Sequence, residues 1–136
     1  MDGNTPNTLP KSERLHGKKG IERLLAGGRH GSVGALRYRY LLNNGEENCR
    51  ILVSVPKKLF KRAVKRNLLK RRIRESWRHL KHQIQSEKGI DILFMYSTKE
   101  ILTYQEIYSH VESIITKLNG IQKPAVKETE NENEER

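Results

Sequence analysis

The sequence predicts a small α/β domain in which helices pack against a mixed β-sheet. Apolar residues recur at helical spacing in three segments, and they alternate or run together in three shorter ones. The predicted order is helix, strand, strand, helix, strand, helix, which implies a sheet with helices packed on it. A chain of 136 residues is long enough for one domain with one hydrophobic core.

The first half of the chain is expected to form a short helix followed by two strands. Residues 18–26 carry apolar side chains at positions i, i+3 and i+4, and Gly27-Gly28 ends this helix. Residues 36–42, LRYRYLL, alternate as a strand does. A turn signal at 43–45 precedes the returning strand over 50–55.

The second half is expected to form a long helix, a buried strand and a last helix. Residues 62–85 show an apolar stripe at helical spacing. The stripe consists of Leu69, Ile73, Trp77, Leu80 and Ile84. Residues 90–96, IDILFMY, are largely apolar, as in a strand covered on both faces. Residues 103–118 again show the spacing of a helix with one buried face.

Both ends of the chain are expected to be disordered, which leaves 13–119 as the folded domain. Residues 1–12 are polar and contain proline, whereas residues 120–136 are acidic and lack a core pattern. The N-terminus has no apolar signal region, and no segment approaches the roughly 18 apolar residues of a membrane span. Cys49 is the single cysteine. We therefore predict a cytoplasmic protein that does not bind membranes.

The charge of the chain is concentrated in one segment. Residues 57–81 contain 12 Lys or Arg residues and one Glu, so this segment alone accounts for the formal net charge of +11. The remaining bases and acids cancel. Such a concentration predicts a polyanion-binding surface, and nucleic acid is the favoured partner.

The predicted basic helix has a polar flank beside its apolar stripe. The flank consists of Asn67, Lys70, Arg71, Arg74, Arg78 and Lys81. Arginine offers bidentate phosphate contacts, and each neutralised phosphate releases counterions. Arg62 and Arg66 lie in line with the stripe, so either the helix overhangs the sheet or both side chains point into a ligand groove. A basic face that serves only solubility is the alternative.

Tyr38 and Tyr40 allow two interpretations. They share one face of the predicted strand, while Arg37 and Arg39 share the other. Aromatic side chains on an open sheet can stack on unpaired bases. Ordinary core packing explains the same pattern equally well.

The sequence contains no recognisable catalytic constellation. His79 and His82 have the i, i+3 spacing of half a metal site, but no third ligand is indicated. Ser54 has no identifiable His or Asp partner. We therefore predict no catalytic and no metal-binding residue in this chain.

The basic helix and the strand before it resemble the protein subunit of bacterial ribonuclease P. The similarity rests on a strand containing Ser, a Lys pair, an Ala-Val-x-Arg-Asn run, a Lys-Arg pair and an Arg-Glu pair at that family's spacing. The matching residues are Val53-Ser54-Val55, Lys57-Lys58, Ala63-Val64-Lys65-Arg66-Asn67, Lys70-Arg71 and Arg74-Glu75. Together with weaker similarity elsewhere, the resemblance covers residues 13–118.

The resemblance implies a small two-layer α/β sandwich with three helices and a left-handed crossover near the basic helix. It also implies a subunit of an endoribonuclease holoenzyme whose RNA subunit carries the catalysis. One protein would bind one catalytic RNA and the precursor tRNA, whose 5′ leader is removed with Mg²⁺ bound mainly by the RNA. The RNA-binding residues would be Lys57, Lys58, Lys61, Arg62, Lys65, Arg66, Asn67, Lys70, Arg71 and Arg74. A cleft between the first helix and the sheet would take the leader, and we predict that Ile21, Leu25, Tyr38 and Tyr40 line it.

The sequence departs from the family in three places. The loop after Lys58 is one residue longer than the family's common pattern, with Leu59-Phe60-Lys61-Arg62 in place of a small residue or Gly. Leu68 replaces the last member of the usual Arg-Asn-Arg run, and Ile21 and Leu25 stand where the first helix usually carries aromatics. Stacking on the leader would then fall to Tyr38 or Tyr40. A ribosomal or other structural RNA-binding protein remains the alternative, although no motif matches one in register. A DNA-binding regulator is disfavoured because a strand, not a helix and a short turn, precedes the basic helix.

Overall fold

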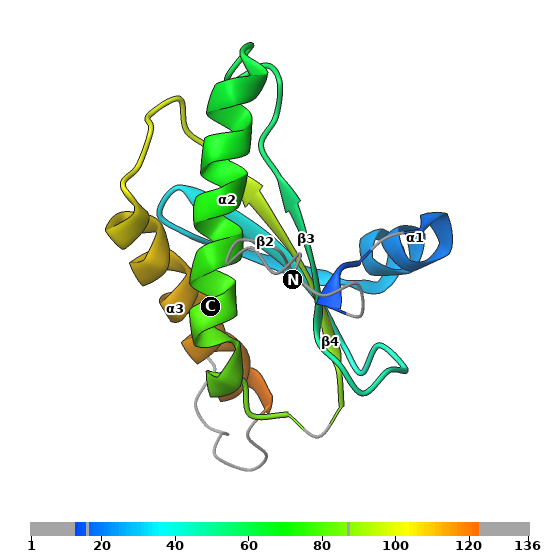
Figure 1. Cartoon of the computed structure of the whole chain (residues 1–136). Helices are drawn as coiled ribbons and strands as arrows, with labels where there is room; N and C mark the ends of the chain where they lie inside the picture. Colours follow the sequence, from blue (N-terminus) through cyan, green and yellow to red (C-terminus); the bar gives the residue numbers. More distant parts are fainter. Residues whose placement is uncertain (1–12, 16, 87, 123–136) are drawn as a thin grey trace, which may run out of the picture.

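A four-stranded mixed sheet and three α-helices form the fold, which confirms the predicted α/β class (Figure 1). The computed structural model describes residues 13–15, 17–86 and 88–122. The predicted tail over 1–12 therefore lies outside the described residues, as does the predicted tail over 120–136 except for residues 120–122, which belong to a helix. The elements are α1 (Lys18–Gly27), β1 (Arg29–Val33), β2 (Leu36–Leu42), β3 (Arg50–Ser54), α2 (Ala63–Leu80), the short 3-10 helix η2 (Lys81–Gln83), β4 (Ile90–Tyr96) and α3 (Tyr104–Gln122).

The strands lie in the order β1-β2-β4-β3. β2 pairs antiparallel with both β1 and β4, whereas β3 pairs parallel with β4. β4 is therefore a central strand, and its almost continuous burial agrees with its apolar sequence. The parallel pair is joined through α2 in a left-handed crossover, as the resemblance implied (Figure 1).

β1 is an element that the sequence did not predict. Its residues, RHGSV, are mostly polar and largely exposed, so they give no alternating pattern. Pairing with β2 makes this segment a strand, and Gly34 provides the positive φ of 55° in the tight turn between them. β1 forms one edge of the sheet.

The two faces of the sheet are covered unequally. Helices α2 and α3 pack side by side on one face, and this layer contains the main hydrophobic core (Figure 1). The predicted stripe of α2 supplies four fully buried residues to it, Leu69, Ile73, Trp77 and Leu80. On the other face, α1 contributes Leu24 to a smaller cluster with Leu15 and Leu93. Much of that second face is left open.

The ends of two helices differ from the prediction. We predicted a helix to residue 85, but α2 ends at Leu80 and passes into η2. Asn119 explains the change, because its amide donates to Gln83 O at 2.8 Å and accepts from Gln85 N at 2.8 Å. Conversely, α3 continues to Gln122, beyond the predicted end at 118 and the predicted domain boundary at 119.

A buried polar network fixes the connection between β2 and β3. Asp91 is fully buried on β4, and both of its carboxylate oxygens accept from Arg50 at 2.9 Å. Asn44 donates to Asp91 Oδ1 at 2.7 Å and accepts from Glu46 N at 2.7 Å. The network thereby connects the loop after β2 with the two strands β3 and β4.

Candidate nucleic-acid interface

The segment between β3 and α2 presents lysines to solvent because one aromatic residue anchors it. Leu59 N and Phe60 N both donate to Pro56 O, at 3.1 and 3.4 Å, which forms a turn. The Phe60 ring is buried and meets the Tyr96 ring edge-on, with a centroid distance of 5.8 Å. The exposed lysines of this segment are Lys57, Lys58 and Lys61.

The first turn of α2 is electropositive in its backbone as well as in its side chains. Arg62 occupies the N-cap without a side-chain capping bond, and the first turn contains no acidic residue. The free N–H groups of a helix start carry a partial positive charge, which favours an anion. This end of α2 extends past the sheet, and Val64 is 75% exposed there (Figure 1).

Arg66 lies where α2 extends past the sheet, which is the first of the two arrangements that the sequence left open. Its Nη1 donates to Phe60 O and to Lys61 O, both at 2.8 Å. The guanidinium therefore holds the incoming segment against the helix, and it keeps further N–H groups for a ligand. Arg62 is exposed at the same end.

Only part of the predicted flank of α2 is unpaired. Arg78 donates to both carboxylate oxygens of Glu75, at 3.2 and 2.7 Å, and Lys81 contacts both oxygens of Glu13 at 2.7 Å. Within the described ranges, no hydrogen bond or ion pair engages the side chains of the remaining flank. These are Asn67, Lys70, Arg71 and Arg74. Lys65, near the start of the helix, is likewise unpaired there.

Glu75 shows why the lower part of α2 is less cationic than its sequence suggests. The hydrogen bond from Arg78, with a smaller contribution from His79, holds the pKa of the Glu75 carboxyl below its usual range. This acid therefore stays charged near neutral pH and neutralises a neighbouring base. The unpaired charge is concentrated in the first half of α2 and in the segment before it.

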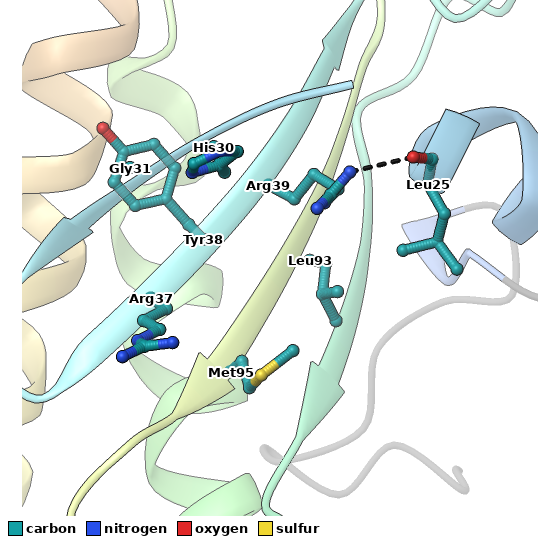
Figure 2. Close-up of a pocket in the computed structure, with 8 residues that line it drawn as sticks. All are labelled: Leu25, His30, Gly31, Arg37, Tyr38, Arg39, Leu93 and Met95. Carbon is teal, nitrogen blue, oxygen red and sulfur yellow. Dashed lines mark hydrogen bonds between the residues drawn. The ribbon is translucent and has the colours of Figure 1, made fainter. Parts of the chain in front are cut away.

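The predicted role of Tyr38 and Tyr40 in the leader cleft is wrong. Both side chains are only 6% exposed and belong to the core that α2 and α3 cover. Their rings stack on each other with a centroid distance of 6.0 Å, and burial raises the pKa of both phenols. In Figure 2 the Tyr38 ring turns over Gly31, away from Arg37 and Arg39.

The open face of the sheet holds a pocket of about 300 Å³ next to α1. Its lining residues are Leu25, His30, Gly31, Arg37, Tyr38, Arg39, Leu93 and Met95. Arg39 Nη1 donates to Leu25 O at 2.8 Å, a bond that ties the end of α1 to the strand (Figure 2).

Two of the four residues predicted for the cleft, Ile21 and Leu25, have their side chains on this side of the sheet. Tyr38 also lines the pocket, although its ring belongs to the main core. Leu25 lines the pocket and is 49% exposed, whereas Ile21 packs against the smaller hydrophobic cluster. The pocket also contains residues that were not predicted for it, namely His30, Gly31, Arg37, Arg39, Leu93 and Met95. The alternation in LRYRYLL had already placed both arginines opposite the tyrosines, and this was the available signal.

The described residues gather exposed cations and a pocket rather than metal-ligating side chains. Within them no group of three or more His, Cys, Asp or Glu side chains is arranged to hold a metal ion. His79 lies 3.1 Å from Glu75, and His82 is exposed. Exposed cations, an uncapped helix start and a pocket with arginines over apolar side chains together suit a polyanion with unstacked bases. No helix in the described ranges has the length and apolar content to cross a bilayer.

Comparisons with known proteins agree with the motif. The family model described as Ribonuclease P matches residues 9–119. A ribonuclease P protein component from Porphyromonas gingivalis is 34% identical over 119 residues, which cover 82% of this chain and 87% of the relative. One from a Picosynechococcus species is 36% identical over 92 residues, covering 68% and 78%. The RNase P protein of Staphylococcus aureus superposes with a TM-score of 0.67 at 26% identity, over 78% of this chain and 94% of that one.

Proposed function

Because the chain belongs to the ribonuclease P protein family, we propose that it is the protein subunit of a ribonuclease P that removes the 5′ leader of precursor tRNA. The observation that carries this proposal is the unpaired positive charge on the segment before α2 and on the first half of that helix. Family membership favours this function over the alternative of a ribosomal or other structural RNA-binding protein.

The proposed roles of the protein and of the RNA subunit follow from the chemistry of the protein's side chains. The first half of α2 binds the catalytic RNA through phosphate contacts of Lys and Arg, and Asn67 adds a hydrogen bond to a phosphate, a 2′-hydroxyl or a metal-bound water. We propose that Mg²⁺ is held mainly by the RNA, which carries the catalysis. The protein cations supply part of the charge neutralisation that Mg²⁺ would otherwise have to provide.

The pocket on the open face binds the single-stranded leader. Arg37 contacts the leader backbone, while Leu25 and Met95 give an apolar surface for unstacked bases. Arg39 holds α1 in place through Leu25 O and so sets the width of the cleft. The leader is therefore bound without tyrosine stacking, since both candidate rings lie in the core.

We place one copy of this protein on each RNA, in the cytoplasm. The chain has one basic helix, which suits one docking site on the RNA. Cys49 is the single cysteine, and burial raises the pKa of its thiol, so it is poorly reactive.

Reconstitution with a bacterial ribonuclease P RNA tests the proposed function. Added protein is expected to raise the cleavage rate of precursor tRNA at low Mg²⁺, and protein without RNA is expected to cleave nothing. The variant Lys117→Ala removes an exposed cation from α3 and should stimulate the RNA as well as the wild type does. The proposal fails if the wild-type protein does not stimulate the RNA, or if RNA-free protein cleaves the substrate.

A further inference from the structure

Arg14 is held beside α2 by the backbone of the N-terminal segment. Leu15 N donates to Ile51 O at 2.8 Å, and Arg14 forms a parallel bridge with Ile51 at the free edge of β3. Partners in such a bridge point to the same face of a sheet. Ile51 is buried in the core under α2, so the Arg14 side chain lies on the side of the sheet that faces this helix.

Arg74 is the residue of α2 that lies near enough to Arg14 for their charges to interact. Its side chain is partly buried, and burial followed by the positive charge of Arg14 lowers the pKa of the Arg74 guanidinium. Lys81 follows Arg74 by seven residues, or about two turns, so it lies on the same side of the helix, where it contacts Glu13. Residues 13–15 thus lie beside this flank of α2, with Glu13 in contact with Lys81 and the charge of Arg14 acting on Arg74.

The two arginines have no counter-ion among the described residues. The acid next to each of them in sequence is already engaged, since Glu13 binds Lys81 and Glu75 binds Arg78. Two guanidinium groups that repel each other, one of them partly buried, are unfavourable in the free protein. An arrangement of this kind is typical of a site that an anion completes.

We propose that Arg14 and Arg74 together bind one phosphate group of the RNA, at a site formed jointly by the N-terminal segment and α2. The identity of the ligand as RNA rests on the proposed function, whereas the phosphate chemistry rests on the two guanidinium groups. The site extends the unpaired surface of α2 by one contact from a different element. The unpaired surface of α2 ends at Lys81, because Glu13 neutralises the charge of this lysine.

The first experiment uses inorganic phosphate and the free protein. The melting temperature is compared in phosphate and in sodium chloride of equal ionic strength, since a ligand that binds the folded state raises it. Phosphate is expected to stabilise the wild type beyond chloride, and Arg14→Ala should lose most of this additional increase. In chloride, Arg14→Ala should melt no lower than the wild type, because it relieves a repulsion and Arg14 is exposed.

The matched control is Arg29→Ala, which removes an exposed arginine from the opposite edge of the sheet. This control should keep the full response to phosphate. The proposal is overturned if Arg14→Ala and Arg29→Ala respond to phosphate alike, or if the response shows an adventitious ion only, unaffected by either change. A lower melting temperature of Arg14→Ala in chloride would assign Arg14 a purely structural role.

The second experiment measures affinity for ribonuclease P RNA. Arg14→Ala and Arg74→Ala should each weaken binding about tenfold, the value expected for one charge-assisted contact. The double variant should be little weaker than either single one, because both side chains serve one phosphate. Arg14→Lys should restore only part of the affinity, since lysine keeps the charge but not the bidentate fork.

Strictly additive losses would show two independent contacts and overturn the shared site. Wild-type protein that binds no ribonuclease P RNA would refute the proposed function instead. In that case the response to inorganic phosphate would still decide whether Arg14 and Arg74 form an anion site.

Discussion

Two neighbouring residues of β2, Arg37 and Tyr38, lie on opposite faces of the sheet, and only Tyr38 is buried. Alternation in the sequence shows which residues share a face of a strand, but it does not show which of the two faces is buried. Which face is covered depends on where α2 and α3 dock, and that is decided by residues far away in the chain. The sequence therefore predicted the two groups correctly and assigned the tyrosines to the wrong side of the sheet.

Replacing each of these two residues should separate stability from leader binding. Tyr38→Ala is expected to lower the free energy of unfolding by about 3–5 kcal/mol, because it empties a core site. It should leave the ratio of affinities for precursor and mature tRNA unchanged. Arg37→Ala should lower that ratio about three- to tenfold, since only the precursor has a leader, with less than about 0.5 kcal/mol lost in stability. Equal ratios in all three proteins would exclude leader binding by Arg37.

Asp91 should be among the residues most sensitive to replacement. Asp91→Ala leaves Arg50 and Asn44 without their shared acceptor, and we expect it to lower the free energy of unfolding by about 3 kcal/mol. Denaturant unfolding measures this loss. Glu47→Ala, in the exposed part of the neighbouring loop, serves as the control and should change stability by less than about 0.5 kcal/mol. Similar losses in the two variants would contradict a stabilising role for the network.

At the scale of elements, the position and the charge of α2 could be predicted from the sequence, but the partners of its cationic side chains could not. Its apolar stripe is local information, and the four residues of the stripe within α2 are indeed buried. The acceptors that bind its cationic side chains belong to distant parts of the chain. Glu13 binds Lys81, and the carbonyl of Leu102 accepts from Arg72. β1 could not be predicted for a similar reason, because its strand conformation depends on pairing with β2 rather than on its own side chains.

The unpaired half of α2 should determine the salt dependence of RNA binding. Lys70→Ala and Arg71→Ala are each expected to weaken binding by about 0.5–1.5 kcal/mol. The slope of log affinity against log salt should fall by about 0.7–0.9 for each lost phosphate contact. Titrations at several salt concentrations measure both quantities, with Lys117→Ala as the control on α3. An unchanged slope in the double variant would mean that this flank faces solvent in the complex.

For the whole molecule, the net charge of +11 should make salt act in opposite directions on two properties. Salt screens the mutual repulsion of the clustered cations, so the melting temperature of the free protein should rise between low and moderate sodium chloride. Over the same range the affinity for RNA should fall by at least tenfold, because the release of counterions into a more concentrated salt solution gains less free energy. Calorimetry and binding titrations test the pair of trends. A melting temperature that falls with salt would show that ion pairs such as Arg78–Glu75 outweigh the repulsion.

The position of β4 in the sheet has a consequence for synthesis on the ribosome. β2 and β3 leave the ribosome well before the strand that joins them, because β4 is the last strand of the chain and lies between them. A nascent chain that stops before Ile90 holds a hairpin, an isolated strand and a cationic helix with no sheet beneath it. The basic helix α2 therefore has no complete sheet to pack on early in translation. β2 and β3 are joined into one sheet only when β4, in the last third of the chain, emerges.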